Sequence, residues 1–109
     1  MTGKEIVYIA GPITNDPDYE RKFNQVEKKL REMGYRPINP IAGNEKRRGW
    51  TYKQYIDRGL RLLMTSDAIC ITDVWVDSKG LDAETAYVDA VGLPKMYAIE
   101  IEPGIWDIE

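Results

Sequence analysis

The sequence contains no histidine and a single cysteine, Cys70, which lies within an apolar run. These absences exclude the usual zinc sites and the Ser-His and Cys-His catalytic arrangements. A lone cysteine in an apolar run is typical of a buried thiol in a reducing compartment, so we expect a cytoplasmic protein. If the chain is an enzyme, its carboxylates, hydroxyls and amides must carry the chemistry.

Long apolar runs are also absent. No stretch approaches the ~20 apolar residues of a transmembrane helix, and the first residues lack the apolar region of a signal peptide. The formal net charge is −3, which argues against a nucleic-acid polymer as partner. With 109 residues, 43% of them hydrophobic, we expect a single domain over residues 1–109.

Apolar runs alternate with amphipathic stretches along the chain. Strands are predicted at residues 6–10, 35–38, 67–74 and 95–101, and helices at 18–33, 51–64 and 80–91. This alternation predicts a parallel sheet, because each parallel connection needs a crossover helix. We therefore expect a small doubly wound, flavodoxin-like α/β fold with strand order 2-1-3-4, and the tail leaves room for a fifth edge strand.

The segment from Trp75 to Glu84 links the third expected strand to the third expected helix. Ser78 and Gly80 stand near the start of that helix, where free backbone amides attract anions, although the same residues suit an ordinary helix cap. From Leu81 the spacing 81, 84, 88, 91 forms one apolar face, and Glu84 lies on it. Glu84 is therefore a candidate functional carboxylate, unless it reaches solvent at the edge of the helix.

Gly11 and Pro12 follow the first strand, near the switch point of the expected sheet. They lack the G-x-G-x-x-G pattern of dinucleotide binding, so they are either a plain turn or part of a different ligand site. Tyr8, Trp50 and Trp75 could stack on a base, although aromatic residues more often pack in a core.

Several motifs together resemble the nucleoside 2-deoxyribosyltransferase-like superfamily, especially its short bacterial and phage members. They are Tyr8–Pro12, Tyr19-Glu20 with Phe23, Pro37–Pro40, Ser66–Ile69 and Trp75-x-x-Ser78-Lys79-Gly80-x-x-x-Glu84. The resemblance covers most of the chain. It implies a homo-oligomer, which we expect to be a dimer, and chemistry at the N-glycosidic bond of a nucleoside or nucleotide without a metal or organic cofactor.

The resemblance also implies roles for individual residues. Glu84 matches the position of the nucleophile, Tyr8 would hold it in place, and the segment after Gly11 would cover the base. Members that act on free nucleosides tend to carry aspartate six residues before the glutamate, whereas the related 2'-deoxynucleoside 5'-monophosphate N-glycosidases carry serine, as this chain does at Ser78. A neutral hydroxyl beside helix-terminal amides accepts a phosphate dianion that an aspartate would repel, so we expect a nucleoside 5'-monophosphate as substrate.

Position 59 departs from the resembled pattern. The family usually has an aspartate eight residues before the position of Asp67, where it serves the leaving base as an acid, and this chain has Gly59. Asp57 is close in sequence, but two residues along a helix turn a side chain by about 200°. Either the helix is distorted and Asp57 substitutes, or protonation of the base is lost. A non-catalytic nucleotide-binding protein and an interaction protein therefore stay open as alternatives.

Overall fold

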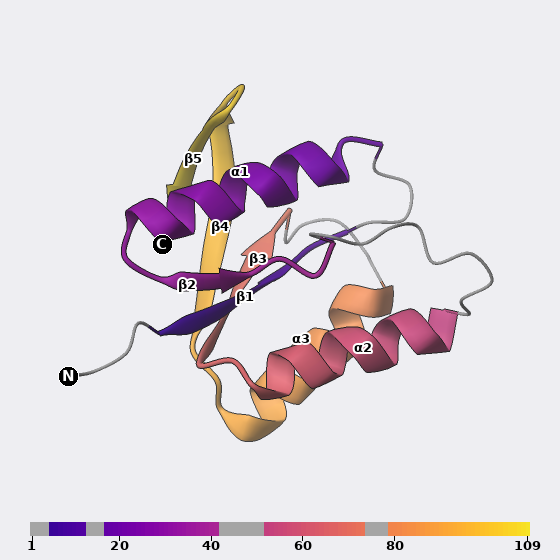
Figure 1. Ribbon diagram of the computed structural model, residues 1–109. Helices are drawn as coiled ribbons and strands as arrows, with labels where there is room; N and C mark the ends of the chain where they lie inside the picture. The colour runs from indigo at the N-terminus through magenta and orange to yellow at the C-terminus, as the bar shows by residue number, and fades with distance from the viewer. Residues whose placement is uncertain (1–4, 13–16, 42–51, 74–78) are drawn as a thin grey trace.

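The computed structural model describes residues 5–12, 17–41, 52–73 and 79–109. Five strands form one sheet in this part of the chain, and three helices flank it (Figure 1). The elements are β1 (Ile6–Ala10), α1 (Tyr19–Glu32), β2 (Arg36–Ile38), α2 (Tyr52–Met64), β3 (Ala68–Thr72), α3 (Lys79–Val91), β4 (Lys95–Glu102) and β5 (Ile105–Ile108). Each strand and helix expected from the apolar periodicity is confirmed.

The sheet has the order β2-β1-β3-β4-β5, which confirms the doubly wound α/β fold. β1 pairs in parallel with β2 and β3, and β4 pairs in parallel with β3. The tail supplies the fifth edge strand, β5, which runs antiparallel to β4. The reversal occurs at Pro103-Gly104, where Gly104 has φ 79°, a turn conformation that glycine adopts without strain.

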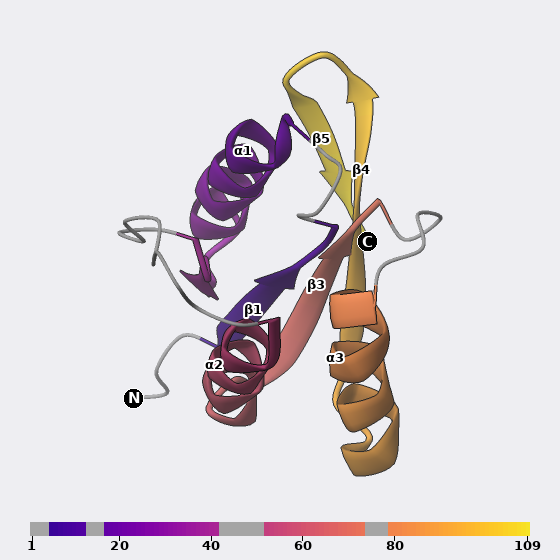
Figure 2. The same ribbon diagram turned by 90° about the vertical axis from the view of Figure 1, so that its right-hand side faces the viewer.

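The two faces of the sheet carry separate cores, because successive strand residues point to opposite sides. α1 covers one face, and α2 and α3 cover the other (Figure 2). The α1 side contains Val7, Ile9, Phe23, Val26, Leu30, Ala68, Cys70, Ala98 and Trp106. The other side contains Tyr8, Ala10, Leu63, Ile69, Ile71 and Val88. None of the helices in the described ranges combines the length and the apolar character that a membrane span requires.

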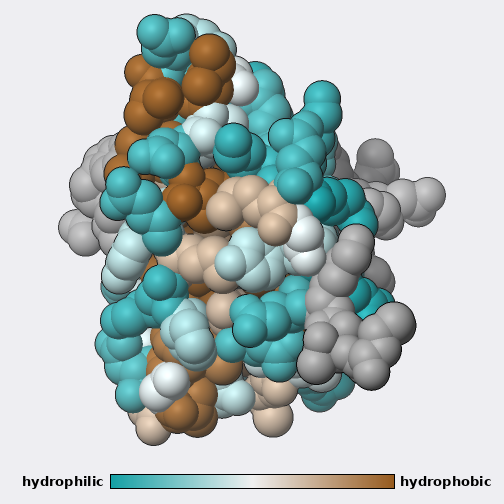
Figure 3. Space-filling model, turned by 90° about the vertical axis from the view of Figure 1, so that its left-hand side faces the viewer, coloured by the Kyte–Doolittle hydropathy of each residue, from teal (hydrophilic) through white to brown (hydrophobic). Residues whose placement is uncertain are grey.

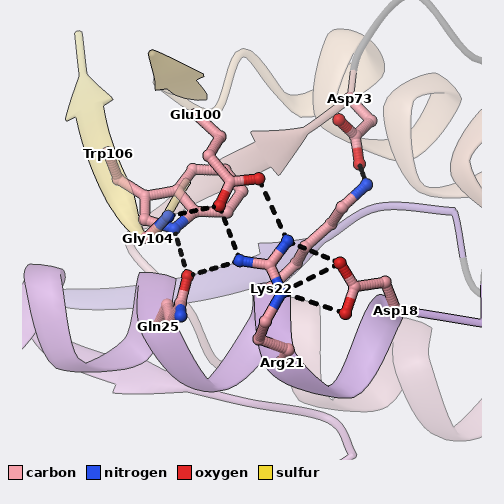
Figure 4. Close-up of polar contacts among 8 residues, drawn as sticks. All are labelled: Asp18, Arg21, Lys22, Gln25, Asp73, Glu100, Gly104 and Trp106. Carbon is pink, nitrogen blue, oxygen red and sulfur yellow. Dashed lines mark hydrogen bonds and ion pairs between the residues drawn. The ribbon is translucent and has the colours of Figure 1, made fainter. Parts of the chain in front are cut away.

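Polar contacts attach the β4–β5 hairpin to α1 (Figure 4). Arg21 Nη1 lies 2.6 Å from Glu100 Oε2, and Glu100 also accepts a hydrogen bond of 2.8 Å from the Gly104 amide. Gln25 Oε1 accepts hydrogen bonds from Arg21 Nη1 at 2.9 Å and from Trp106 Nε1 at 2.8 Å. Trp106 is only 5% exposed. The hairpin is therefore held by both a buried indole and an ion pair.

The far side of the same hairpin carries exposed apolar residues. Ile99, Ile101 and Ile105 are 38%, 60% and 50% exposed. Hydrophobic surface accordingly gathers over the hairpin at the top of the molecule (Figure 3). Trp106 of the same hairpin instead packs against α1. The oligomeric state stays a prediction.

Gly11, directly after β1, has no room for a side chain. A Cβ atom there would lie 1.9 Å from Thr72 Oγ1 and 3.3 Å from Phe23 Cε1. Because overpacking a dense core costs about 1–3 kcal/mol, we expect Gly11→Ala to lower the free energy of unfolding by about 2 kcal/mol or more in urea denaturation. Gly34→Ala is the control, since its Cβ would meet nothing within 4 Å and only the φ of 95° is unfavourable. Equal losses in the two variants would contradict a packing role for Gly11.

Candidate active site

The fold brings Tyr8 and Glu84 together on the side of the sheet that α2 and α3 cover. Tyr8 projects from β1 into this core and is 2% exposed. Glu84 lies near the start of α3, the helix that follows β3 in the chain. The Tyr8 hydroxyl is a hydrogen-bond donor to the Glu84 carboxyl group. Tyr8 and Glu84, which are far apart in the sequence, thus form one contact.

Burial determines the electrostatics of this pair. It raises the pKa of Glu84 to about 7, and the hydrogen bond from Tyr8 limits the rise. Glu84 Oε2 is buried and has no hydrogen-bond partner within the described ranges. Burial and the nearby Glu84 charge raise the pKa of Tyr8, so the phenol keeps its proton and remains a donor. A carboxyl group that changes its charge near neutral pH is typical of catalytic acids, bases and nucleophiles.

Helix α2 adds a cation to the site. Arg58 Nη1 donates a 2.8 Å hydrogen bond to the carbonyl oxygen of Pro40, just after β2. Its positive charge opposes the rise in the pKa of Tyr8, which indicates that the guanidinium lies near the phenol. Sequence reasoning missed Arg58, and its position beside Gly59 on an amphipathic helix was the only signal. The site therefore contains one carboxyl group, one phenol and one guanidinium.

Asp57 points elsewhere. Its Oδ2 lies 2.9 Å from Lys53 Nζ, and the aspartate side chain is 45% exposed. α2 runs unbroken from Tyr52 to Met64, so it lacks the distortion that would let Asp57 replace the acid missing at Gly59. Asp67 accepts a 2.8 Å hydrogen bond from the Ile6 amide and thus ties the starts of β3 and β1 together.

The end of β3 carries polar groups on the α1 side of the sheet. Thr72 Oγ1 is buried beside Gly11 and has no hydrogen-bond partner in the part of the chain described. Asp73 has φ 47°, a left-handed conformation that is uncommon outside glycine, and its Oδ2 lies 2.9 Å from Lys22 Nζ (Figure 4). Sequence reasoning did not single out these groups, since their burial arises only from tertiary packing.

The remaining expected site residues have different outcomes. Gly11 and Pro12 are buried at the end of β1, and Gly80 lies in the first turn of α3. Ser78 and Trp75, like Trp50, lie outside the described residues. Within the described ranges, no group of three or more carboxylate or cysteine side chains is placed to hold a metal ion.

A comparison with protein families matches residues 5–97 to the family described as "Domain of unknown function (DUF4406)". The chain belongs to this family. A comparison with curated proteins finds no match.

Solved structures share the fold. A 2-deoxyribosyltransferase from Bacillus psychrosaccharolyticus is 20% identical with a TM-score of 0.64, over 84% of this chain and 70% of that one. A 2-desoxiribosyltransferase from Leishmania mexicana is 20% identical with a TM-score of 0.64, over 85% and 63%. A conserved protein from Enterococcus faecalis V583 is 19% identical with a TM-score of 0.66, over 85% and 62%. The chain thus spans less than two thirds of two of these structures, and the expected resemblance is confirmed at the level of the fold.

The raised pKa of Glu84 predicts a pH-dependent stability. The ordinary pKa is 4.5, and the folded value is about 7. Because the unfolded chain loses this proton first as the pH rises, the Glu84 contribution is present below pH 4.5 and is lost between about pH 4.5 and 7, by up to about 3 kcal/mol. Urea unfolding at pH 5 and pH 8 should show this loss in the wild type and a smaller one in Glu84→Gln. The same pH dependence in both proteins would rule out a carboxyl group that is buried in this way.

Proposed function

We propose that this protein cleaves or transfers the N-glycosidic bond of a nucleoside 5'-monophosphate, with Glu84 as the nucleophile. The observation that carries the proposal is the buried carboxyl group of Glu84 with the Tyr8 hydroxyl as its donor. The fold shared with 2-deoxyribosyltransferases supports it, since the chain follows those structures over most of its length.

In the proposed reaction, a carboxylate oxygen of Glu84 attacks the anomeric carbon of the sugar. The bond from carbon to the base nitrogen breaks, its electron pair leaves with the base, and a glycosyl ester remains on the enzyme. Water then attacks the same carbon and gives one proton to the departed base anion, so that the carboxylate is released together with the free sugar phosphate. Alternatively, a second base attacks, loses its N–H proton to the departed base anion, and gives a new nucleotide. Retaining glycosidases use this double displacement through an oxocarbenium-like transition state.

The Tyr8 hydroxyl and the burial of Glu84 both affect the nucleophile in this scheme. Tyr8 orients the carboxyl group and stabilises its ionised form by donating a hydrogen bond. Burial opposes ionisation and raises the pKa to about 7, so the nucleophilic carboxylate forms as the pH rises through the neutral range. The rate of base release should therefore rise with pH through this range.

A second function is favoured by Gly59. Position 59 offers no side chain that could give a proton to the departing base, and Asp57 is paired with Lys53 on the exposed side of α2. A protein with this arrangement could bind a nucleotide without cleaving it. Chromatography for released free base separates the two functions, and isothermal titration against a nucleotide panel separates both from a pure interaction protein.

Glu84→Gln keeps the size of the side chain and removes its charge. It should abolish base release from a nucleoside 5'-monophosphate while the dissociation constant changes by only several-fold, because the lost interaction serves mainly the transition state. Release of base is measured by chromatography and binding by titration calorimetry. A variant that releases base at the rate of the wild type would show that Glu84 is not the nucleophile.

Ser78 and the amides near Gly80 are proposed to bind the phosphate. Ser78→Asp places a negative charge beside this dianion and should weaken monophosphate binding at least tenfold, about 1.4 kcal/mol. Ser78→Ala is the control, since it removes the hydroxyl without adding a charge. Titration with the monophosphate and with the free nucleoside tests the idea, which fails if the aspartate variant keeps the wild-type preference for the monophosphate.

A further inference from the structure

Gly59 on α2 faces the hydroxyl group of Tyr8. A Cβ atom at position 59 would lie 2.9 Å from the Tyr8 hydroxyl oxygen, closer than real Cβ contacts allow. Apart from the neighbours Arg58 and Leu60 and the nearby backbone of α2, this oxygen is the only heavy atom of the described residues within 4 Å of that point. The tight contact therefore depends on a single atom of Tyr8.

The tyrosine ring has little freedom to move away. Tyr8 lies in β1, where its backbone pairs with Ile38 of β2 and Ile69 of β3. The side chain is 2% exposed and belongs to the core cluster that includes Leu63 and Val88. The neighbouring strands fix the Tyr8 backbone, and the packed core encloses its ring. A new Cβ atom at position 59 would therefore have to displace the hydroxyl or push α2 outward.

The same hydroxyl is the donor to Glu84. We propose that Gly59 is a positioning residue: by carrying no side chain it admits the Tyr8 hydroxyl against α2 and so keeps this donor on the Glu84 carboxyl group. The catalytic meaning of the proposal rests on the proposed function. The geometric coupling of Gly59, Tyr8 and Glu84 does not depend on it.

The contact between Gly59 and Tyr8 also bears on the acid that is missing at position 59. The Cβ atom of an acid at position 59 would lie 2.9 Å from the Tyr8 hydroxyl in its present place, so the hydroxyl or the helix would have to shift. Gly59→Asp is therefore expected to disturb the Tyr8–Glu84 contact rather than to complete the site. Glycine at position 59 therefore fits the position that the Tyr8 hydroxyl occupies in this structure.

A double-mutant cycle between Tyr8→Phe and Gly59→Ala tests the coupling. Alanine is a better helix former than glycine, so an unobstructed Gly59→Ala substitution raises the melting temperature. We expect Gly59→Ala to lower the melting temperature of the wild type and to raise that of Tyr8→Phe, where the obstructing oxygen is gone. Tyr97→Phe is the matched control, because Tyr97 packs against the same core cluster without approaching Gly59. In that background Gly59→Ala should lower the melting temperature as it does in the wild type.

A second readout follows the carboxyl group itself. The pKa of Glu84 is measured in the free protein by NMR of labelled glutamate carboxyl carbons, with Glu84→Gln used to assign the signal. Among the described residues, Tyr8 on β1 acts on Glu84, and Arg58 on α2 acts on Tyr8. Both residues remain in Gly59→Ala. Loss of the Tyr8 donor should raise the pKa of Glu84 in Gly59→Ala and in Tyr8→Phe. The double variant should show no further rise beyond Tyr8→Phe.

The outcomes separate the proposal from the proposed function, because neither readout needs a substrate. If Gly59→Ala alone fails to fold while the double variant folds, the coupling is supported. If Gly59→Ala has the same effect on the melting temperature in all three backgrounds, or leaves the pKa of Glu84 unchanged, the proposal is overturned. A confirmed cycle in a protein that releases no base would keep the positioning role and reject the glycosidase.

Discussion

Parallel pairing of β1 with β3 fixes the place of the Tyr8 ring, and the site depends on that constraint. Tyr8 lies opposite Ile69 in this pairing and opposite Ile38 in the pairing with β2. Because neighbouring strands hold the Tyr8 backbone on both sides, the position of the tyrosine is fixed. The contact therefore depends on α3, which places the carboxyl group of Glu84 beside the Tyr8 hydroxyl. Burial of that carboxyl group costs free energy, and the same burial moves its pKa into the range where its charge changes near neutral pH.

The two faces of the sheet have different roles. The α1 side holds ion pairs at its margins, between Lys22 and Asp73 and between Arg21 and Glu100, which fix the end of β3 and the hairpin to the helix. On the opposite side, Tyr8 belongs to an apolar core cluster, and the buried carboxyl group of Glu84 and the charge of Arg58 act on its hydroxyl. In such low-dielectric surroundings an electrostatic interaction is stronger than it is near water, so the Tyr8 donor has a large influence on Glu84.

Sequence patterns predict much of this arrangement because they report burial. The alternation of apolar runs located the strands and helices, and Glu84 was conspicuous as a carboxylate on an apolar helix face. Contacts across the fold leave no such pattern. Arg58 looks like any helical cation until the carbonyl oxygen of Pro40 and the phenol of Tyr8 are placed beside it. The closeness of Gly59 to the same phenol likewise requires the packed structure.

In the proposed reaction, protonation of the leaving base decides between cleavage and binding. The proton of Tyr8 is committed to Glu84, and its raised pKa makes it a poor acid. Glu84 cannot attack while its carboxyl group is protonated. Neither Tyr8 nor Glu84 is therefore free to protonate a base during attack by Glu84. A base whose anion is only weakly basic needs no such help, whereas a base whose anion is strongly basic would stay attached. The reactivity of this site consequently depends on the leaving base as much as on the nucleophile.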